Sequence, residues 1–168
     1  MVEHGLIAED ERLEVIDGEI VEMSPKGYRH EGLKGAINRH WGRTCPSEFD
    51  YLPETGLYLS DDTYLEPDFV LFRAGLPLPD LKGPEVLLAI EVADSSLAYD
   101  LRRKPVIYAL FGVKELWVID VRSRRVHRHR EPGRQGFGRI DTEEAETQLE
   151  PAFGPAEMGF RLLNMPEH

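Results

Sequence analysis

The order of apolar and polar positions along the chain predicts short strands separated by two helices. Near the N-terminus, Arg12–Val15 and Glu19–Met23 flank Asp17-Gly18, a dipeptide typical of the tight turn of a β-hairpin. Two more short strands are predicted, one around Tyr51 and one over Gly56–Ser60. The N-terminal third of the chain is therefore expected to be rich in β-structure.

A helix is predicted from about Tyr28 to Trp41. Four of its residues recur at helical spacing and form one stripe: His30, Leu33, Ile37 and Trp41. Three of them are large and apolar, so the stripe is expected to face the interior and to place His30 there as well.

Two β-rich runs in the middle of the chain predict central strands. The first is EPDFVLF, and the second is PEVLLAIEV. The second run is almost wholly apolar from Val86 to Ile90, as expected of a strand that is covered on both faces. Glu91 closes this run, and a carboxylate at the end of a buried strand requires an explanation.

A second helix is predicted from about Leu97 to Phe111, with Ser95-Ser96 as a cap and Gly112 after its end. Pro105 lies inside it and is expected to kink it or to divide it into two short helices. Farther on, ELWVID predicts a buried strand and RRVHRHR its hairpin partner, while GFRLL fits either a strand or a short helix. Together these elements predict one α/β domain over residues 1–168 with a mixed sheet.

The composition narrows the class of protein. With 168 residues and 41% hydrophobic content, the chain fits one globular domain. Cys45 is its only cysteine, which excludes an intramolecular disulfide and a zinc cluster. No run approaches the roughly 18 apolar residues of a membrane helix, and the first residues are acidic where a signal peptide is basic. We expect a cytoplasmic protein with no membrane association.

Charge is unevenly distributed. The net charge of −11 argues against a protein that coats nucleic acid, because phosphate neutralisation requires Lys and Arg. Even so, Arg102 and Arg103 adjoin Lys104, and a second basic run from 122 to 134 contains Arg124 and Arg128. These four arginines are candidates for local contact with nucleic acid. A charged edge strand that resists aggregation is the alternative interpretation of the second run.

Two carboxylates are predicted to meet at the edge of the central sheet. Side chains alternate along a strand, so Asp68 shares a face with Val70 and Phe72. The same alternation places Glu91 on a face that also holds Leu87, Ala89 and Ala93. If the two strands are neighbours, Asp68 and Glu91 converge, and oxygen ligands of this kind suit Mg²⁺ or Mn²⁺. The alternative is that Asp68 caps a turn while Glu91 pairs with an arginine.

An ordered series of motifs bears on this choice. The chain contains Pro67-Asp68 followed by FVLF, then IEVADSS from Ile90, and then Asp100, Lys104, Tyr108 and Gly112 at intervals of four before the strand ELWVID. From about Arg12 to His129 this series resembles the PD-(D/E)XK nucleases, and within them the Uma-type family of restriction-endonuclease-like proteins. The resemblance implies a restriction endonuclease-like fold, with a mixed central β-sheet flanked by helices and an N-terminal β-hairpin.

The resemblance also implies a Mg²⁺- or Mn²⁺-dependent DNA endonuclease with Asp68 and Glu91 as metal ligands. The superfamily pattern expects a lysine two residues after the glutamate, and this chain has Ala93 there. Lys104 is the natural substitute as a catalytic group, with His30 and Asp100 as supporting or substrate-contacting residues. An ion pair of Asp100 with Lys104 on a solvated helix face is the simpler account of that spacing.

Two functions remain open at this point. The first is the DNA endonuclease, expected to act as a homodimer because cutting both strands needs two sites. The second is a nucleic-acid-binding or protein-interaction module that keeps the fold without cleavage. The intact pair Asp68 and Glu91 favours the first, whereas Ala93 and the acidic net charge favour the second.

Overall fold

A six-stranded sheet forms the centre of the molecule. The computed structural model describes residues 13–23 and 26–166. The strand order of the large sheet is β10-β9-β8-β7-β6-β3. Its strands are β3 (Phe49–Pro53), β6 (Phe69–Arg73), β7 (Leu88–Ala93), β8 (Glu115–Asp120), β9 (Arg125–Gly133) and β10 (Gly136–Glu143). Only β7 and β8 pair in parallel among these neighbours, so the sheet is mixed, as predicted.

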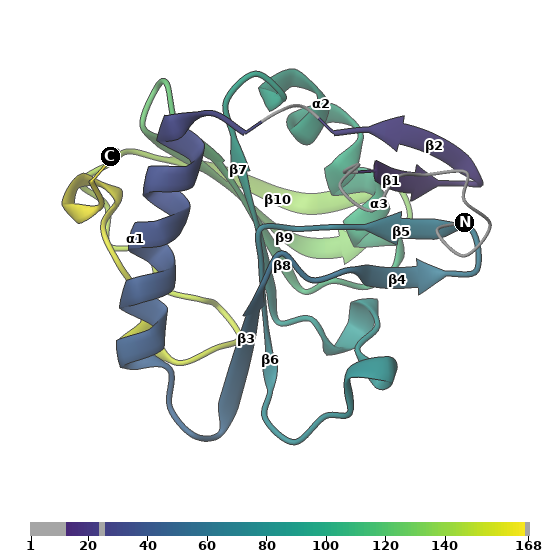
Figure 1. Ribbon diagram of the computed structural model, residues 1–168, viewed down its shortest axis with the longest axis horizontal. Coiled ribbons are helices and arrows are strands. Elements are labelled where there is room, and N and C mark those ends of the chain that lie inside the picture. The colour runs from purple at the N-terminus through teal and green to yellow at the C-terminus, as the bar shows by residue number, and fades with distance from the viewer. Residues whose placement is uncertain (1–12, 24–25, 167–168) are drawn as a thin grey trace.

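A second sheet of four strands lies beside the first (Figure 1). Its order is β2-β1-β5-β4, and all its pairs are antiparallel. Its strands are β1 (Leu13–Ile16), β2 (Glu19–Glu22), β4 (Leu57–Ser60) and β5 (Thr63–Leu65). The predicted hairpin is confirmed, because β1 and β2 join through Asp17 and Gly18, which both have positive φ. Arg12 lies outside the described residues.

Three α-helices flank the sheets: α1 (Tyr28–Thr44), α2 (Leu97–Arg102) and α3 (Lys104–Leu110). Helix α1 runs three residues beyond its predicted end, and the predicted stripe from His30 to Trp41 is buried. The second predicted helix is divided at Arg103, because Pro105 supplies no N–H for a continuous helix. Gly112, with φ of 85°, follows α3.

The large sheet separates two hydrophobic cores, and Figure 1 shows the elements that cover its two faces. Helix α1 and the C-terminal segment cover one face, on which Trp41, Phe69 and Trp117 are packed. The small sheet and helices α2 and α3 cover the other face, where Tyr108 and Val118 lie. Two structural layers on opposite faces therefore hold the central strands β7 and β8, which are buried throughout.

Some elements differ from the sequence prediction. Strands β5 and β10 were not predicted, and the GFRLL segment supplies a single bridge of Phe160 to Leu149 and a 3-10 turn over Leu162–Asn164. Leu87 precedes β7 and packs in the α1 core, whereas Ala89 and Ala93 face the other core. Within the described residues, no helix is long and apolar enough to cross a membrane.

Candidate active site

Asp68 and Glu91 lie side by side on neighbouring strands. Strand β6 pairs antiparallel with β7, and Phe69 is opposite Ile90. Continuing this register by one residue places Asp68 opposite Glu91. Both side chains are buried, with 5% and 3% of their surface exposed. The structure thus brings together the two carboxylates that the sequence indicated.

Asp68 is held by one backbone and one side-chain donor. The Val92 N–H donates to Asp68 Oδ2 at 2.8 Å, and His30 Nε2 lies 3.1 Å from Asp68 Oδ1. Burial favours the neutral carboxyl, but the His30 contact and the Val92 N–H outweigh it and lower the pKa of Asp68. Asp68 is therefore an ionised acceptor, and its orientation is fixed by His30 of α1 and by the Val92 N–H of β7.

The pKa of Glu91 is shifted in the direction opposite to that of Asp68. The Tyr108 hydroxyl donates to Glu91 Oε1 at 2.6 Å, and Lys104 Nζ lies 3.2 Å from the same oxygen. Burial raises the pKa of Glu91 well above its usual range, Lys104 opposes this rise, and neighbouring carboxylates add to it. Tyr108 is fully buried in the core, and nothing in the sequence pattern indicated the contact of its hydroxyl with Glu91.

Lys104 joins three carboxylates from three elements. Its Nζ lies 3.0 Å from Glu14, 3.2 Å from Glu91 and 3.3 Å from Asp100. Burial opposes its charge, yet the three carboxylates outweigh burial and raise the pKa of Lys104 well above its usual range. The predicted pair of Asp100 with Lys104 exists, but it is buried rather than solvated, and the Ser96 hydroxyl donates to Asp100 at 2.6 Å.

Glu14 is a site residue that the sequence reasoning missed. It lies on β1, is 1% exposed, and accepts from the Glu66 N–H at 3.4 Å as well as from Lys104. Strand alternation puts Glu14 on the same face as the buried Ile16, and a carboxylate at an interior position is a signal of function. The apolar neighbours Leu13 and Val15 hid that signal, because either face of β1 could have been interior.

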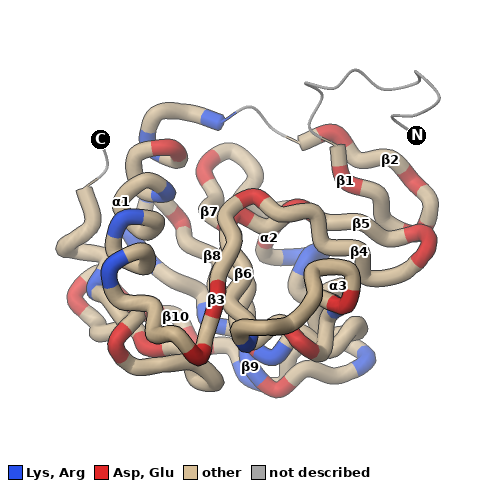
Figure 2. Tube along the Cα trace, turned by 60° about the horizontal axis from the view of Figure 1, so that its bottom comes forward, with Lys and Arg blue, Asp and Glu red and all other residues tan. Residues whose placement is uncertain are grey.

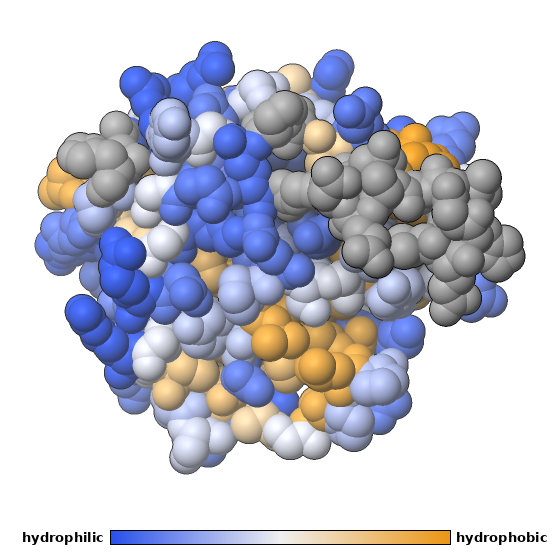
Figure 3. Space-filling view, viewed as in Figure 1, coloured by the Kyte–Doolittle hydropathy of each residue, from blue (hydrophilic) through white to orange (hydrophobic). Residues whose placement is uncertain are grey.

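These side chains line a cavity of about 350 Å³ between α1, the small sheet and α2. Lys26, Asp94 and Arg102 also line it. In the space-filling view, hydrophilic residues gather over this region between α1 and the N-terminal hairpin (Figure 3). A polar, partly enclosed hollow of this size has room for a phosphate group and water.

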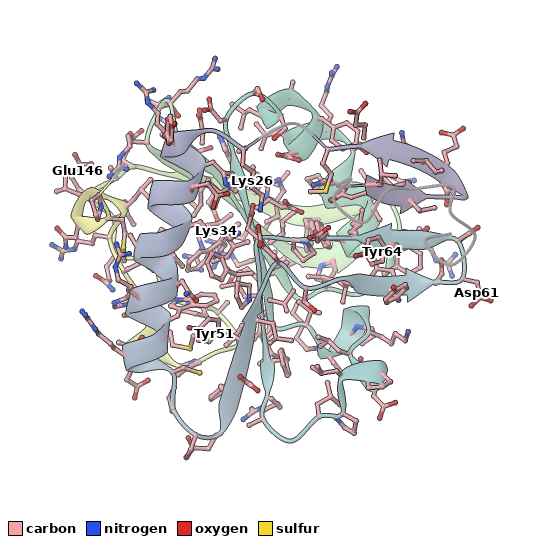
Figure 4. The ribbon with its side chains drawn as sticks, in the orientation of Figure 1. Lys26, Lys34, Tyr51, Asp61, Tyr64 and Glu146 are labelled. Carbon is pink, nitrogen blue, oxygen red and sulfur yellow. The ribbon has the colours of Figure 1, made fainter. Side chains whose placement is uncertain are left out.

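Two further lysines gather beside the cavity. Lys26, before α1, and Lys34, on α1, both pair with Glu54, and Figure 4 shows both between the helix and the strands. Lys34 is buried, and the charge of Lys26 contributes to the lowered pKa of Asp68. No motif in the sequence indicated a role for either lysine.

The donor set fits a divalent cation. Glu14, Glu91 and Asp100 surround the buried Lys104, and Asp68 lies beside Glu91, so the carboxylates of this cluster are in excess over the lysine that they contact. A cation beside Asp68 and Glu91 would offset this excess with the hard oxygen ligands that Mg²⁺ and Mn²⁺ prefer. Within the described part of the chain, no group of three or more His, Cys, Asp or Glu side chains is placed to hold a metal ion. Asp68 and Glu91 are accordingly the two ligands that this chain would offer.

The four arginines selected as nucleic-acid contacts are dispersed. Arg102 lines the cavity, and it also lines a second hollow beside α3 together with Arg103. Arg124 donates to the carbonyls of Leu162 and Met165, and Arg128 pairs with the fully buried Glu115 at 2.7 Å. These partners favour a structural role for Arg124 and Arg128, and their contact with nucleic acid stays a prediction.

A mixed sheet with a buried Asp and Glu on adjacent strands defines the restriction endonuclease-like class of fold. The structure is similar to the crystal structure of a protein from Anabaena variabilis, described as "a putative nuclease belonging to DUF820", with a TM-score of 0.70 and 17% identity. The similarity covers 96% of this chain and 93% of that chain. At this identity the likeness shows the shared fold.

The family follows from the sequence match. The model of the Uma2 family, described as "Putative restriction endonuclease", matches residues 3–162. The chain belongs to this family, which confirms the resemblance inferred from the motifs. Among curated proteins, none matches the chain significantly.

Proposed function

We propose that the protein is a metal-dependent endonuclease that hydrolyses phosphodiester bonds of DNA. The observation that carries this proposal is the placement of Asp68, Glu91 and Lys104 in one polar cavity at the edge of the central sheet. Two carboxylates and an ammonium supply the ligands and the positive charge that phosphoryl transfer needs. Membership of the Uma2 family supports the same function.

Each residue has a distinct part in this proposal. When bound, Mg²⁺ or Mn²⁺ would make water more acidic and would polarise the phosphoryl oxygen. Asp68 is kept ionised and oriented by Val92 N–H and His30, and Glu91 is oriented by the Tyr108 hydroxyl. Lys104 provides positive charge where the phosphate becomes more negative.

One observation favours the second candidate, a module that binds nucleic acid without cutting it. The Lys104 ammonium already faces three carboxylates, and the motif position of the lysine is the buried Ala93. In this arrangement Lys104 would be a structural counter-charge rather than a catalytic group. The two functions differ in one measurable property, which is cleavage.

Plasmid nicking with Mg²⁺ or Mn²⁺ tests the proposal. We expect wild type to nick supercoiled DNA and Asp68→Ala to be inactive, while Asp61→Ala, which removes an exposed carboxylate of the turn between β4 and β5, retains activity. DNA binding without nicking would identify the binding module instead. Equal nicking by wild type and Asp68→Ala would reveal a contaminating nuclease.

We also propose that the active form is a homodimer. One chain of this size carries one such cavity, and cutting both strands of a duplex requires two, which a C₂ pair supplies. Light scattering at concentrations on the order of ten micromolar is expected to give twice the chain mass of 19.2 kDa. A monomer under conditions in which linear plasmid is produced would contradict this proposal.

A further inference from the structure

The arginines of this protein fall into two groups, those with partners inside the molecule and those without. In the region of β9 and β10, five arginines pair with carboxylates: Arg122, Arg125, Arg128, Arg130 and Arg139. Arg29, Arg39, Arg43 and Arg161, in contrast, have no ion pair among the described residues. Most of the arginine charge of the β9–β10 hairpin is therefore already compensated, with the exposed Arg134 of its turn as an exception, whereas the arginine charge of α1 is available to an external ligand.

Three of these unpaired arginines are spread along α1. Arg39 and Arg43 are one turn apart, on the side of the helix away from the buried stripe of Leu33 and Ile37, and Arg29 lies at the N-terminal end of the helix. All three arginines are exposed. Bands of positive charge follow one another along α1 in Figure 2. We call Arg29, Arg39, Arg43 and Arg161 the α1 basic strip.

A hollow lies beside the C-terminal half of α1, at the end of the strip that holds Arg39 and Arg43. It has a volume of about 450 Å³ and lies between α1 and the C-terminal segment. Arg39, Arg43 and Arg161 line it together with His40, Gln148 and Asn164, and none of its lining residues is acidic. The chain has 31 Asp and Glu residues and a net charge of −11, so a hollow lined by three arginines and no carboxylate is a positively charged site on an acidic protein.

The strip begins beside the candidate active site. Arg29 directly precedes His30, whose ring contacts Asp68. From Arg29 to Arg43 the helix rises by about 21 Å, and each strand of a DNA duplex carries one charge per roughly 3.4 Å of axis. The strip therefore spans a length that corresponds to about six phosphates of one strand.

We propose that the α1 basic strip binds the phosphodiester backbone of the polynucleotide whose scissile phosphate lies in the cavity. This proposal rests on the proposed function. Arginine is suited to the task because its planar guanidinium donates two parallel hydrogen bonds to a phosphate. Backbone contacts of this kind position the substrate and are independent of its base sequence.

Salt-dependent binding in EDTA tests the proposal separately from cleavage. Fluorescence anisotropy of labelled DNA and RNA duplexes is to be measured for wild type and for Arg39→Ala/Arg43→Ala. The slope of log affinity against log salt should become shallower by about two in the variant, about 0.9 for each lost contact. Arg39→Lys/Arg43→Lys should restore most of the slope, and a difference between the two duplexes identifies the natural polymer.

Arg125→Ala/Arg139→Ala is the charge-matched control, because these arginines are about as exposed but already paired. Its slope should equal that of wild type. An equal change of slope in control and test variants would overturn the proposal, as would an unchanged slope in the test variant. Displacement of DNA by poly-glutamate as effectively as by plasmid would also overturn it, because the strip would then be a site for acidic proteins. If wild type nicks plasmid but the strip variant shows an unchanged salt slope, the proposal for the α1 basic strip fails while the proposed function stands.

Discussion

The Tyr108 hydroxyl donates a hydrogen bond to Glu91 Oε1 over 2.6 Å, and both groups are buried. The bond connects α3 with the central strand β7. It satisfies a phenol and a carboxylate that would each be costly to bury alone. It also fixes the carboxylate of Glu91 beside Asp68, so an aromatic residue that reads as core filling in the sequence orients a candidate ligand.

Replacing Tyr108 with Phe should weaken metal binding without removing it. The substitution keeps the ring in the core but deletes the donor, and loss of a group that orients a metal ligand typically lowers affinity about 10- to 100-fold. Titration calorimetry with Mn²⁺ measures the effect. Tyr58→Phe is the control, because Tyr58 is exposed on β4 and should bind Mn²⁺ as wild type does. Equal affinity in both variants would refute the orienting role of Tyr108.

Replacing Glu91 with Gln should abolish Mn²⁺ binding while the protein stays folded. The amide keeps an oxygen for the Tyr108 hydroxyl but loses the negative charge that a cation requires. Because burial already raises the pKa of Glu91, the neutral side chain suits its surroundings, and thermal stability without metal should not fall. Calorimetry and a thermal melt measure the two effects, and an unchanged binding isotherm would place the metal elsewhere.

Lys104→Met should have two effects. Turnover should fall by roughly two to three orders of magnitude if the ammonium offsets charge in the transition state. The contacts of the ammonium predict a loss of stability as well. Removing the counter-charge of Glu14, Glu91 and Asp100 leaves buried carboxylates uncompensated, at a cost of about 3–5 kcal/mol.

Added metal should distinguish these effects. In the Lys104→Met variant a divalent cation would be the main counter-charge, so Mn²⁺ should raise its melting temperature more than that of wild type. Lys114→Met is the control, because Lys114 lies outside the cavity and its Nζ is placed over the ring of Phe153. A Lys104→Met protein that nicks DNA as fast as wild type would exclude Lys104 from catalysis.

Much of the scaffold of the site could be predicted from local patterns. The apolar run before Glu91 indicated a central strand, and the stripe from Leu33 to Trp41 oriented α1, so His30 was correctly placed inside. The Pro105 ring dictated the break between α2 and α3. These features depend on neighbours within a few residues, which is the range over which periodicity and backbone sterics act.

The remaining contacts depend on the packing of distant segments. Glu14 reaches Lys104 only because the small sheet lies over α3. The two residues are 90 positions apart in the sequence, and no rule of local spacing predicts such a contact. The role of Arg128 was obscured for the same reason. Its partner Glu115 is opposite Arg130 in the strand register, and a charge-rich sequence cannot reveal which arginine turns inward.

The inward arginine provides the last prediction. Arg128 donates from Nη2 to Glu115 at 2.7 Å, and Glu115 is fully buried and also accepts from the Ala152 N–H at 2.9 Å. Removing Arg128 leaves a buried carboxylate with one neutral donor. Breaking a buried pair in this way costs about 3–5 kcal/mol, so Arg128→Ala should lower the free energy of unfolding by that amount in urea titrations.

The control for this prediction is the neighbouring exposed pair. Arg125 contacts Glu144 at 3.1 Å with both side chains about half exposed, and such pairs contribute less than about 1 kcal/mol. Arg125→Ala should therefore melt close to wild type. The double variant Arg128→Met/Glu115→Leu should recover most of the lost stability, because no uncompensated charge remains inside. If Arg128→Ala is as stable as Arg125→Ala, the arginine is available for other partners, and its predicted contact with nucleic acid regains support.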